Sequence, residues 1–455
     1  MHRALLHATM LQTIFHIPHE ILGVPLFGWG WGLVLWALIA IPMIVLVVRE
    51  HGWKPEALNH LTIVVVFGIA IYFLQHLEAR DANNLPVGLP IRGYGVMLLL
   101  GISSGVGLAM YRARRMGGDP ELMMSLAFSM LIAGIVGARL FFIIEFWDQF
   151  QKDTLTATIV AMLKVTEGGL VVYGSLIGGL LAAYFCLTRN NLPILATADL
   201  IAPSLALGLA FGRIGCLLNG CCFGQVSDAP WAITFPRTSS RIDNNSLSPA
   251  YDFQFQSGQF HGIQIGIDKK IRNETNEHPV VVRVKAGSSA DKAGIHRGDR
   301  VLSIGGQPVT TLDNAYQAII QSSPQLVITT DTDKSSVSSL ACFPSKSLPV
   351  HPTQIYSSIH ALLLCLFLLA YYPYRRRDGE VIATCLTIYP IARYLLEMIR
   401  ADESIAWGLT ISQLVSCLLL LAILVLWVIV LRQPRRSALP AVDVTEHHGL
   451  SVLSK

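Results

Sequence analysis

The sequence predicts an all-α polytopic membrane protein, a bundle of about nine transmembrane helices with one small α+β domain inserted outside the membrane. Of the 455 residues, 52% are hydrophobic and only 14% are charged, whereas about 25% of an ordinary soluble domain is charged. The chain contains 37 glycines, and small residues let transmembrane helices approach one another closely. The third observation is that most lysines fall in a single internal segment.

Nine apolar runs are long enough to cross a bilayer, whose hydrocarbon core of about 30 Å requires about 20 apolar residues in a helix. They lie near residues 29–48, 61–77, 94–111, 122–145, 169–187, 197–218, 357–373, 380–399 and 410–431. The first run is too long for the apolar region of a signal peptide, so we expect the N-terminus to be retained.

Arginines in the short connections predict the orientation. They follow the first, third, fifth, seventh and ninth runs: Arg49; Arg112, Arg114 and Arg115; Arg189; Arg375 to Arg377; and Arg432, Arg435 and Arg436. These groups lie on one side of the membrane, which the positive-inside rule assigns to the cytoplasm. We therefore expect a multi-pass protein of the cytoplasmic membrane with its N-terminus outside and its C-terminus inside. No basic run with interleaved aromatic residues indicates a nucleic-acid partner.

The segment 237–350 differs in composition from its surroundings and is predicted to be a soluble domain outside the cytoplasm. Six of the ten lysines of the chain fall in it. Short β-rich runs such as Val280–Val284 and Gln325–Thr329 alternate with Gly-Asp and Gly-Gly turns, and Asp313–Ile320 is predicted to be a helix. The chain thus divides into an N-terminal extension with two helices, a membrane core in two parts, this insert, and a cytoplasmic tail. Their boundaries are 1–90, 91–236, 237–350, 351–432 and 433–455.

The insert resembles a PDZ domain of the kind found in periplasmic proteases. The resemblance rests on GSSADKAGIHRGDRVLSIGG (Gly287–Gly306), followed by PVTTLDNAYQAI, and covers about 250–343. In such domains a loop receives a peptide C-terminus while the peptide adds a strand to the sheet, and GIQIGI (Gly262–Ile267) is the candidate loop. The resemblance implies a peptide or protein ligand; the alternative is a spacer that binds nothing.

Four arginines break the positive-inside pattern, because they lie at or near the outer ends of predicted helices: Arg92, Arg139, Arg213 and Arg393. An arginine in the hydrocarbon region costs at least about 3 kcal/mol, so it normally forms an ion pair or lines a functional cavity. Four at a similar depth indicate an anion site, and the anion at this depth is a phospholipid phosphate. The alternative is a set of ion pairs that only fix the helices.

The eighth predicted helix carries a polar stripe. Tyr389, Arg393, Glu397 and Arg400 follow one another at intervals of four, four and three residues and therefore share one helix face. We expect Glu397 to hold the guanidinium group of Arg393. Asp199 lies deeper in the sixth helix, and we expect it to be a structural partner of a helix end or of an arginine.

Two stretches, FGRIGCLLNGCCFG (Phe211–Gly224) and HPTQIY (His351–Tyr356), resemble the prolipoprotein diacylglyceryl transferases of bacteria. Further motifs agree in order: RGYG (Arg92–Gly95), GARL around Arg139, EGGLVVYGSLIGG (Glu167–Gly179), DLIAP (Asp199–Pro203) and YPIARYLLE (Tyr389–Glu397). The resemblance covers roughly 92–236 and 350–431. It implies a seven-helix core, to which the first two helices and the insert are additions.

The resemblance implies transfer of the diacylglyceryl group of phosphatidylglycerol to the lipobox cysteine of a prolipoprotein, forming a thioether and releasing glycerol 1-phosphate, with no cofactor. Its partners are phosphatidylglycerol and the signal peptide and lipobox of the precursor, in the bacterial cytoplasmic (inner) membrane. By motif position, the catalytic residues are Arg213, Arg393 and Tyr173. The implied phosphatidylglycerol-binding residues are Arg213, Arg92, Tyr94, Arg139, Asn219, Gly224, His351, Gln354, Tyr356, Tyr389 and Glu397.

The chain departs from the family pattern at two positions. Tyr173 stands where the family often has histidine, a candidate general base, and Cys216 stands where it often has asparagine. A tyrosine with a pKa near 10 is a poor base at neutral pH. The base is therefore left open between Tyr173, Glu167 and the phospholipid phosphate itself.

Cys216, Cys221 and Cys222 lack the paired CxxC spacing of a zinc site, so packing is favoured and no metal is expected. Because the substrate supplies the reacting thiol, the sequence predicts that these three are dispensable.

The sequence disfavours two other functions. An intramembrane protease is disfavoured because His19-Glu20 is followed by Gly23 where HExxH needs histidine. A lipid transporter or scramblase is disfavoured because no inverted repeat or broken helix pair is evident.

Overall fold

The computed structural model of the chain describes residues 12–52, 55–80, 85–152, 154–163, 169, 171–238, 247–266, 278–321, 325–331, 337–341, 344–400 and 408–435. The chain forms two compact units. The first comprises Met1–Val96 with Gly215–Gln354, and the second comprises Met97–Ile214 with Ile355–Lys455. Each unit is built from two parts of the chain that are distant in the sequence.

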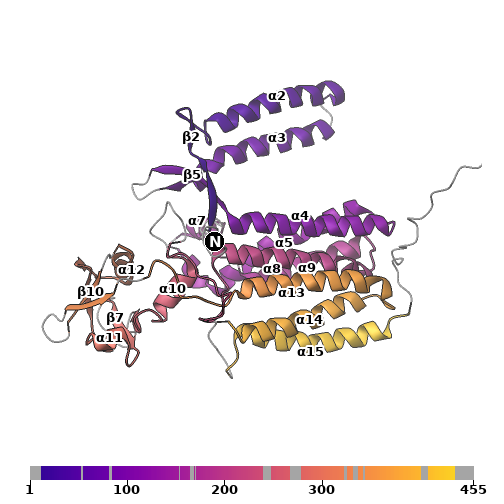
Figure 1. Cartoon of the computed structure of the whole chain (residues 1–455). Helices are drawn as coiled ribbons and strands as arrows, with labels where there is room; N and C mark the ends of the chain where they lie inside the picture. Colours follow the sequence, from indigo (N-terminus) through magenta and orange to yellow (C-terminus); the bar gives the residue numbers. More distant parts are fainter. Residues whose placement is uncertain are drawn as a thin grey trace, which may run out of the picture. The chain divides into compact units, whose positions relative to one another are not determined.

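The second unit is a helix bundle, whose members run side by side in Figure 1. Its long helices are α4 (Gly93–Arg115), α5 (Pro120–Glu145), α8 (Val172–Arg189), α9 (Ile194–Asn219), α13 (Thr353–Tyr371), α14 (Glu380–Glu397) and α15 (Ile411–Arg432). Two short helices, α6 (Trp147–Phe150) and α7 (Leu155–Leu163), follow α5. The first residues of α4 and α13 and the last turn of α9 belong to the first unit.

Within the described residues, seven helices are long and apolar enough to span a membrane: Trp31–Arg49, Gly93–Arg115, Pro120–Glu145, Val172–Arg189, Ile194–Asn219, Thr353–Tyr374 and Ile411–Arg432. They match seven of the nine predicted runs. The other two runs are also helical, in α3 (Pro55–Phe73) and α14. α14 is not among the seven, and its 18 residues carry three charges, Glu380, Arg393 and Glu397.

α5 and α8 form a close helix pair through glycine. A Cβ atom added to Gly174 would lie 2.3 Å from the carbonyl oxygen of Gly137, and one added to Gly178 would lie 2.2 Å from the carbonyl oxygen of Ala133. The backbones therefore approach as far as they can, as in small-xxx-small helix pairs.

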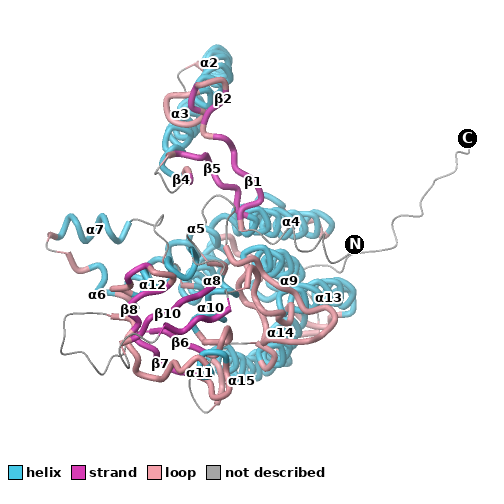
Figure 2. Tube along the Cα trace, turned by 60° about the vertical axis from the view of Figure 1, so that its left-hand side comes forward, coloured by secondary structure: helices cyan, strands magenta, loops and turns pink. Residues whose placement is uncertain are grey.

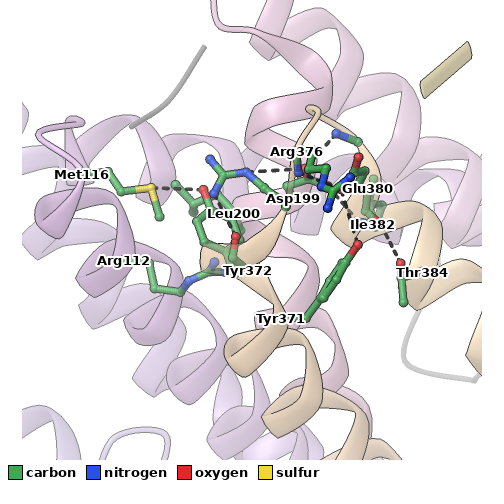
Figure 3. A network of polar contacts seen from close by, with 12 residues as sticks. Arg112, Met116, Asp199, Leu200, Tyr371, Tyr372, Arg376, Glu380, Ile382 and Thr384 are labelled. Carbon is green, nitrogen blue, oxygen red and sulfur yellow. Dashed lines mark hydrogen bonds and ion pairs between the residues drawn. The ribbon is translucent and has the colours of Figure 1, made fainter. Parts of the chain in front are cut away.

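A buried polar cluster closes one end of the bundle (Figure 3). The carboxylate of Asp199 accepts hydrogen bonds from the backbone N–H groups of Gly379 (2.7 Å) and Ile382 (2.8 Å) at the start of α14, and it lies 3.9 Å from Nε of Arg375. An acidic side chain at a helix N-terminus satisfies unpaired N–H groups and interacts favourably with the helix dipole. The predicted structural role of Asp199 is confirmed, since it partners both a helix end and an arginine.

Tyr372 lies between two arginines in the same cluster. The guanidinium carbons of Arg112 and Arg375 are 4.2 Å and 3.7 Å from the centre of its ring. Arg112 also donates to the carbonyl of Leu200, and the Tyr372 hydroxyl donates to Sδ of Met116 (3.2 Å). The ends of α4 and α13 and the beginnings of α9 and α14 therefore meet here.

The first unit contains the N-terminal helix hairpin and a small sheet. Helices α2 (Trp31–His51) and α3 lie next to each other, and η1 (Leu74–Leu77) continues α3. Strands β1 (Thr13–Pro18), β5 (Pro86–Arg92) and β4 (Ala79–Arg80) form an antiparallel sheet in the order β1-β5-β4, beside the two-residue strands β2 (Glu20–Ile21) and β3 (Val24–Pro25). β5 leads directly into α4.

The insert forms an α+β domain within the first unit. A two-stranded sheet contains β6 (Ile263–Gly266) and β7 (Val280–Val284), and a four-stranded sheet has the order β11-β10-β8-β9. The bounds are β8 (Val301–Ile304), β9 (Gln307–Pro308), β10 (Gln325–Thr330) and β11 (Val337–Ala341), with helices α10 (Pro249–Gln256), α11 (Ser289–Lys292) and α12 (Leu312–Gln321). Figure 2 shows these strands in magenta. The two predicted strands and the predicted helix are confirmed.

One hydrophobic core unites both sheets of the insert with its helices. Buried members include Ile263 of β6, Val281 of β7, Ile304 of β8, Ala315 of α12 and Ile328 of β10. Tyr251 and Phe255 of α10 belong to the same core. The domain thus has an interior of its own, as an independently packed domain requires.

Two chain segments leading into and out of the insert pair with each other, and we call them the stalk (226–237 and 345–350). Val226 and Ile233 bridge to Val350, and Pro236 bridges to Lys346, in antiparallel fashion. The backbone N–H of Ser347 donates to the carbonyl of Phe235 (2.8 Å). Ile233, Phe235 and Val350 are buried together with Ala250.

Candidate active site

The predicted ion pair between Arg393 and Glu397 is present near the C-terminal end of α14. Nη1 of Arg393 lies 2.5 Å from Oε2 of Glu397, and Nε of Arg400 lies 3.5 Å from the same oxygen. The residue Glu397 is only 3% exposed. A buried carboxylate with two guanidinium groups is well compensated and holds both in place.

The beginning of α15 completes this cluster. The hydroxyl of Thr410 donates to Oε1 of Glu397 (3.0 Å), and Nη2 of Arg393 donates to Oγ of Ser412 (2.8 Å). Thr410 and Gln413 form a reciprocal capping box that fixes the first turn of α15. Arg393 is thus oriented from two helices.

Arg213 and Tyr389 lie within electrostatic range of Arg393. Arg213 comes from the last third of α9, and Tyr389 is one helical turn before Arg393 on α14. Among the described residues, Arg393 and Arg400 meet at the carboxylate of Glu397, and Arg213 interacts electrostatically with Arg393. Guanidinium groups gathered in this way can bind an anion such as a phosphate.

Arg139 makes contacts of another kind. Its Nε, Nη1 and Nη2 donate to the backbone carbonyls of Met162 (2.9 Å), Gly169 (3.2 Å) and Ala161 (3.0 Å). Ala161 and Met162 are in the last turn of α7, where carbonyl groups lack partners and a cation is favoured. Arg139 therefore holds α7 and the chain before α8 in place.

Tyr173 is the second residue of α8 and is 43% exposed. It is followed by Gly174, which makes the close contact with α5. The position of the ring is therefore set by the tightest helix pair of the bundle. The alternative base Glu167 lies outside the described residues.

Arg92, Tyr94 and Asn219 belong to the first unit. Arg92 ends β5, where it pairs with Thr13, and Tyr94 is in the first turn of α4. The carbonyl of Asn219, at the end of α9, accepts a hydrogen bond from Nε2 of Gln12 (3.1 Å). These residues surround the junction of the N-terminal sheet with α4 and α9.

Gly224, His351 and Gln354 meet at the base of the stalk. The backbone N–H of Gly224 donates to the carbonyl of His351 (2.9 Å), and a Cβ at Gly224 would lie 2.7 Å from Cβ of His351. Nε2 of the buried Gln354 donates to the carbonyl of Cys221 (2.7 Å). Gly224 and the buried amide of Gln354 thus have local structural roles. Tyr356 is half-buried in the first turn of α13, in the second unit.

The three cysteines at the end of α9 lie together. The Sγ atoms of Cys216, Cys221 and Cys222 are all within 4.8 Å of one another. Sequence spacing alone did not predict this arrangement, because the turn at Gly220 (φ +73°) reverses the chain and returns Cys221 and Cys222 toward Cys216.

Sequence analysis also missed Thr410 and Ser412. The first of them had a signal, since Thr410 and Gln413 have the spacing of a capping box ahead of an apolar run. Nothing in the sequence indicated that Ser412 contacts Arg393, because that contact depends on the packing of α14 against α15.

Comparison with known proteins agrees with these motifs. A model of the prolipoprotein diacylglyceryl transferase family matches residues 82–429. A phosphatidylglycerol–prolipoprotein diacylglyceryl transferase of Rhodopirellula baltica is 32% identical over 459 residues, covering 92% of this chain and 89% of the relative. An enzyme of the same name, numbered 2, from Clostridium perfringens is 25% identical over 341 residues, covering 75% of this chain and 91% of the relative.

Proposed function

The chain belongs to the prolipoprotein diacylglyceryl transferase family, and we propose that Arg213 and Arg393 bind the phosphate of phosphatidylglycerol during the transfer that this family catalyses. The protein is a multi-pass membrane enzyme that transfers the diacylglyceryl group from phosphatidylglycerol to prolipoprotein.

The chemistry requires stabilisation of a leaving phosphate. The thiolate of the lipobox cysteine attacks the glycerol carbon, a C–S bond forms, and the C–O bond to phosphate breaks, which releases glycerol 1-phosphate. Negative charge therefore grows on the phosphate in the transition state. Fixed guanidinium groups stabilise such charge, because they need no reorganisation as it develops.

The observation that carries this proposal is that Arg393, which Glu397 orients through the 2.5 Å contact, lies within electrostatic range of a second arginine, Arg213. Two guanidinium groups near each other favour the binding of an anion such as a phosphate. Tyr389 lies one helical turn before Arg393.

The test is the transfer of diacylglyceryl from phosphatidylglycerol to a lipobox peptide by purified protein. Arg213→Gln and Arg393→Gln should each slow transfer by about 100-fold or more, the usual cost of removing a donor that stabilises a transition-state anion. Arg213→Lys should also fail, because a point charge does not replace a bidentate fork. Arg114→Gln, at an exposed position of α4, is the matched control. Near-normal transfer by Arg213→Gln would refute the phosphate-binding role.

We assign Arg139 a positioning role rather than contact with phosphate, since its donors are directed at backbone carbonyls. It holds the end of α7 and Gly169. Tyr173→Phe then tests whether the hydroxyl takes part: a large loss of transfer supports proton transfer or hydrogen bonding by the hydroxyl, and full activity leaves the ring as the functional group.

We also propose a nine-helix topology with the N-terminus outside and the C-terminus inside, and with the insert outside the cytoplasm. The supporting observation is that the arginine-bearing ends of α4 and α13 meet at Tyr372. Fusions of alkaline phosphatase, which is active only outside the cytoplasm, should be active when placed in the insert and inactive after Arg432.

For the insert we propose a peptide-binding role of the PDZ kind. β6 pairs with β7, and among the described residues no other strand pairs with it, so its second edge can accept an extended peptide. α12 packs into the same hydrophobic core as β6. A library of free C-terminal peptides should yield ligands for the full-length protein, and blocking the peptide carboxylate by amidation should abolish binding. Binding that persists after amidation would argue against this mode.

A further inference from the structure

Three thiols gather at the end of α9, three residues beyond Arg213 on the same helix. The Sγ atoms of Cys216, Cys221 and Cys222 all lie within 4.8 Å of one another, and each side chain is half-buried. Buried cysteines are common as small apolar residues. Three that direct their sulfur atoms to one point are a different arrangement, because apolar packing does not require the sulfur atoms to converge.

Hydrogen bonds from α13 fix the backbone that carries two of these thiols. The hydroxyl of Thr353 donates to the carbonyl of Cys222, and Nε2 of Gln354 donates to the carbonyl of Cys221, both at 2.7 Å. Cys222 adopts a left-handed conformation with φ +61°, which is costly for a residue with a side chain. Such strain, together with two hydrogen bonds from α13, indicates that the positions of the thiols are functionally important.

The separations suit a soft metal ion. With zinc–sulfur bonds of about 2.3 Å, the sulfur atoms of a tetrahedral site are about 3.8 Å apart, so these thiols need to move by only about 1 Å. Thiolates select zinc over hard cations. Among the described residues, no fourth histidine, cysteine or carboxylate joins the group. Structural zinc sites have four protein ligands, whereas sites with three leave one position open to water or substrate.

We propose that Cys216, Cys221 and Cys222 form a three-thiolate zinc site whose fourth position binds the sulfur of the incoming lipobox cysteine. This inference rests on the proposed function, because it assigns the activation of the same substrate thiol. A thiol is itself a soft ligand, and the substrate brings one to this enzyme.

The chemistry balances without another reactant. The substrate S–H loses its proton to water as sulfur binds zinc, because a metal-bound thiol is deprotonated. The thiolate attacks the glycerol carbon, and the C–O electron pair leaves with the phosphate. The resulting thioether carries no charge, binds zinc weakly and departs. A metal-bound thiolate also removes the need for a strong base, which accounts for a tyrosine at position 173.

The first experiment measures metal. Full-length protein purified under reducing conditions should contain about one zinc per chain, and cobalt substitution should give the intense sulfur-to-cobalt absorption of thiolate ligands. Both should be lost in the triple variant Cys216→Ser/Cys221→Ser/Cys222→Ser. Both should be kept in the matched control Cys186→Ser/Cys417→Ser, which changes two cysteines outside the cluster. The proposed zinc site is refuted if wild-type protein that contains no zinc still transfers diacylglyceryl. It is also refuted if active protein has a disulfide between any two of Cys216, Cys221 and Cys222.

The second experiment tests the fourth position. A lipobox peptide should shift the cobalt spectrum, and the same peptide with serine in place of cysteine should leave it unchanged. An unchanged spectrum with both peptides refutes coordination of the substrate.

The third experiment separates activation from support of the fold. Without zinc the substrate thiol, with a pKa near 8.5, must ionise unaided. At pH 7 about one thiol in 30 is then ionised, so transfer by the triple serine variant should fall about 30-fold. It should recover as pH rises, whereas wild-type transfer should change little. A variant that is fully active at neutral pH refutes the role of zinc and supports the expectation drawn from sequence, that these cysteines are dispensable.

The two proposals fail in distinguishable ways. Arg213→Gln should keep its zinc and lose transfer. If wild-type protein holds zinc and Arg213→Gln still transfers normally, the phosphate role fails and the metal site stands.

Discussion

At the scale of single residues, the clearest feature is the number of contacts concentrated on Glu397. Its two oxygens meet Arg393, Arg400 and Thr410, which come from α14, the residues that follow it and the start of α15. The carboxylate therefore acts as a positioning group for the arginine that we place at the phosphate.

Glu397→Gln should lower kcat for transfer by at least about tenfold and reduce thermal stability. The reason is that two guanidinium groups lose their buried counter-charge, and breaking a buried ion pair costs about 3 kcal/mol or more. Transfer assays and thermal unfolding in detergent check this result. Glu121→Gln, at an exposed position in the first turn of α5, is the control. A stable variant with unchanged kcat would contradict the positioning role.

A second residue-scale prediction concerns His261, in the turn before β6. Burial lowers the pKa of its imidazole below the usual value of 6.5, so the folded insert favours the neutral ring. The unfolded chain then binds the proton more readily, and the stability of the insert should fall as pH decreases below about 6.5, levelling off below the folded pKa. Above pH 7 the protonation of His261 should no longer change the stability of the insert.

Limited proteolysis of the full-length protein at pH 7.5 and pH 5.5 measures this effect. Cleavage within 278–304 should become faster at the lower pH, relative to an unfolded standard. His261→Gln should flatten the difference, since glutamine does not titrate. An equal pH response in the variant would assign the effect to other groups.

At the scale of helices and strands, sequence patterns predicted the membrane helices well, because each depends on local composition. α14 shows the limit of that approach. Its sequence predicts a membrane helix with polar residues along one face. The positions of those polar side chains, however, depend on α15, because Ser412 contacts Arg393 and Thr410 contacts Glu397. Contacts between helices are set by packing, and a single helix sequence does not specify its neighbour.

The pairing of α5 with α8 gives an element-scale prediction. Gly174→Val should separate the two helices, because even a Cβ atom at this position meets a backbone carbonyl at 2.3 Å. We expect little folded protein and no transfer. Protein yield and gel filtration in detergent are the measurements.

Gly212→Ala is the matched control for this change, since a Cβ there would meet nothing within 4 Å. It should fold and transfer normally. If Gly174→Val folded as well as the control, the close approach of the two helices would not be a requirement of the bundle.

At the scale of the whole molecule, motif order predicted the family. It did not predict the convergence of the three thiols or the role of Arg139. The thiols converge because the chain turns at Gly220, and Arg139 meets backbone carbonyls of α7 and of Gly169. Neither set of contacts has a recognisable spacing in the sequence.

Deleting 250–343 and joining the ends with a short Gly/Ser bridge should preserve transfer to a lipobox peptide within about threefold, because the arginines of the site lie outside the deletion. In cells, transfer to some full-length precursors should decrease, since a peptide-binding domain raises the effective concentration of its ligands. Peptide assays and mass spectrometry of cellular lipoproteins are the measurements.

Two outcomes of this deletion would require revision. A folded deletion variant that no longer modifies even the peptide would make the insert part of the active site. A variant that modifies every precursor normally would refute recruitment by the insert.

The paired stalk has a thermodynamic consequence. Bringing the ends of a flexible segment together costs conformational entropy that grows slowly with its length. Here the bridges between 226–236 and 346–350 already hold those ends as neighbours. The length of the chain between them should therefore add little to the entropy cost of closing the segment. The stalk is a natural place to attach a foreign domain, provided that a residue like Ala250 still covers Ile233, Phe235 and Val350.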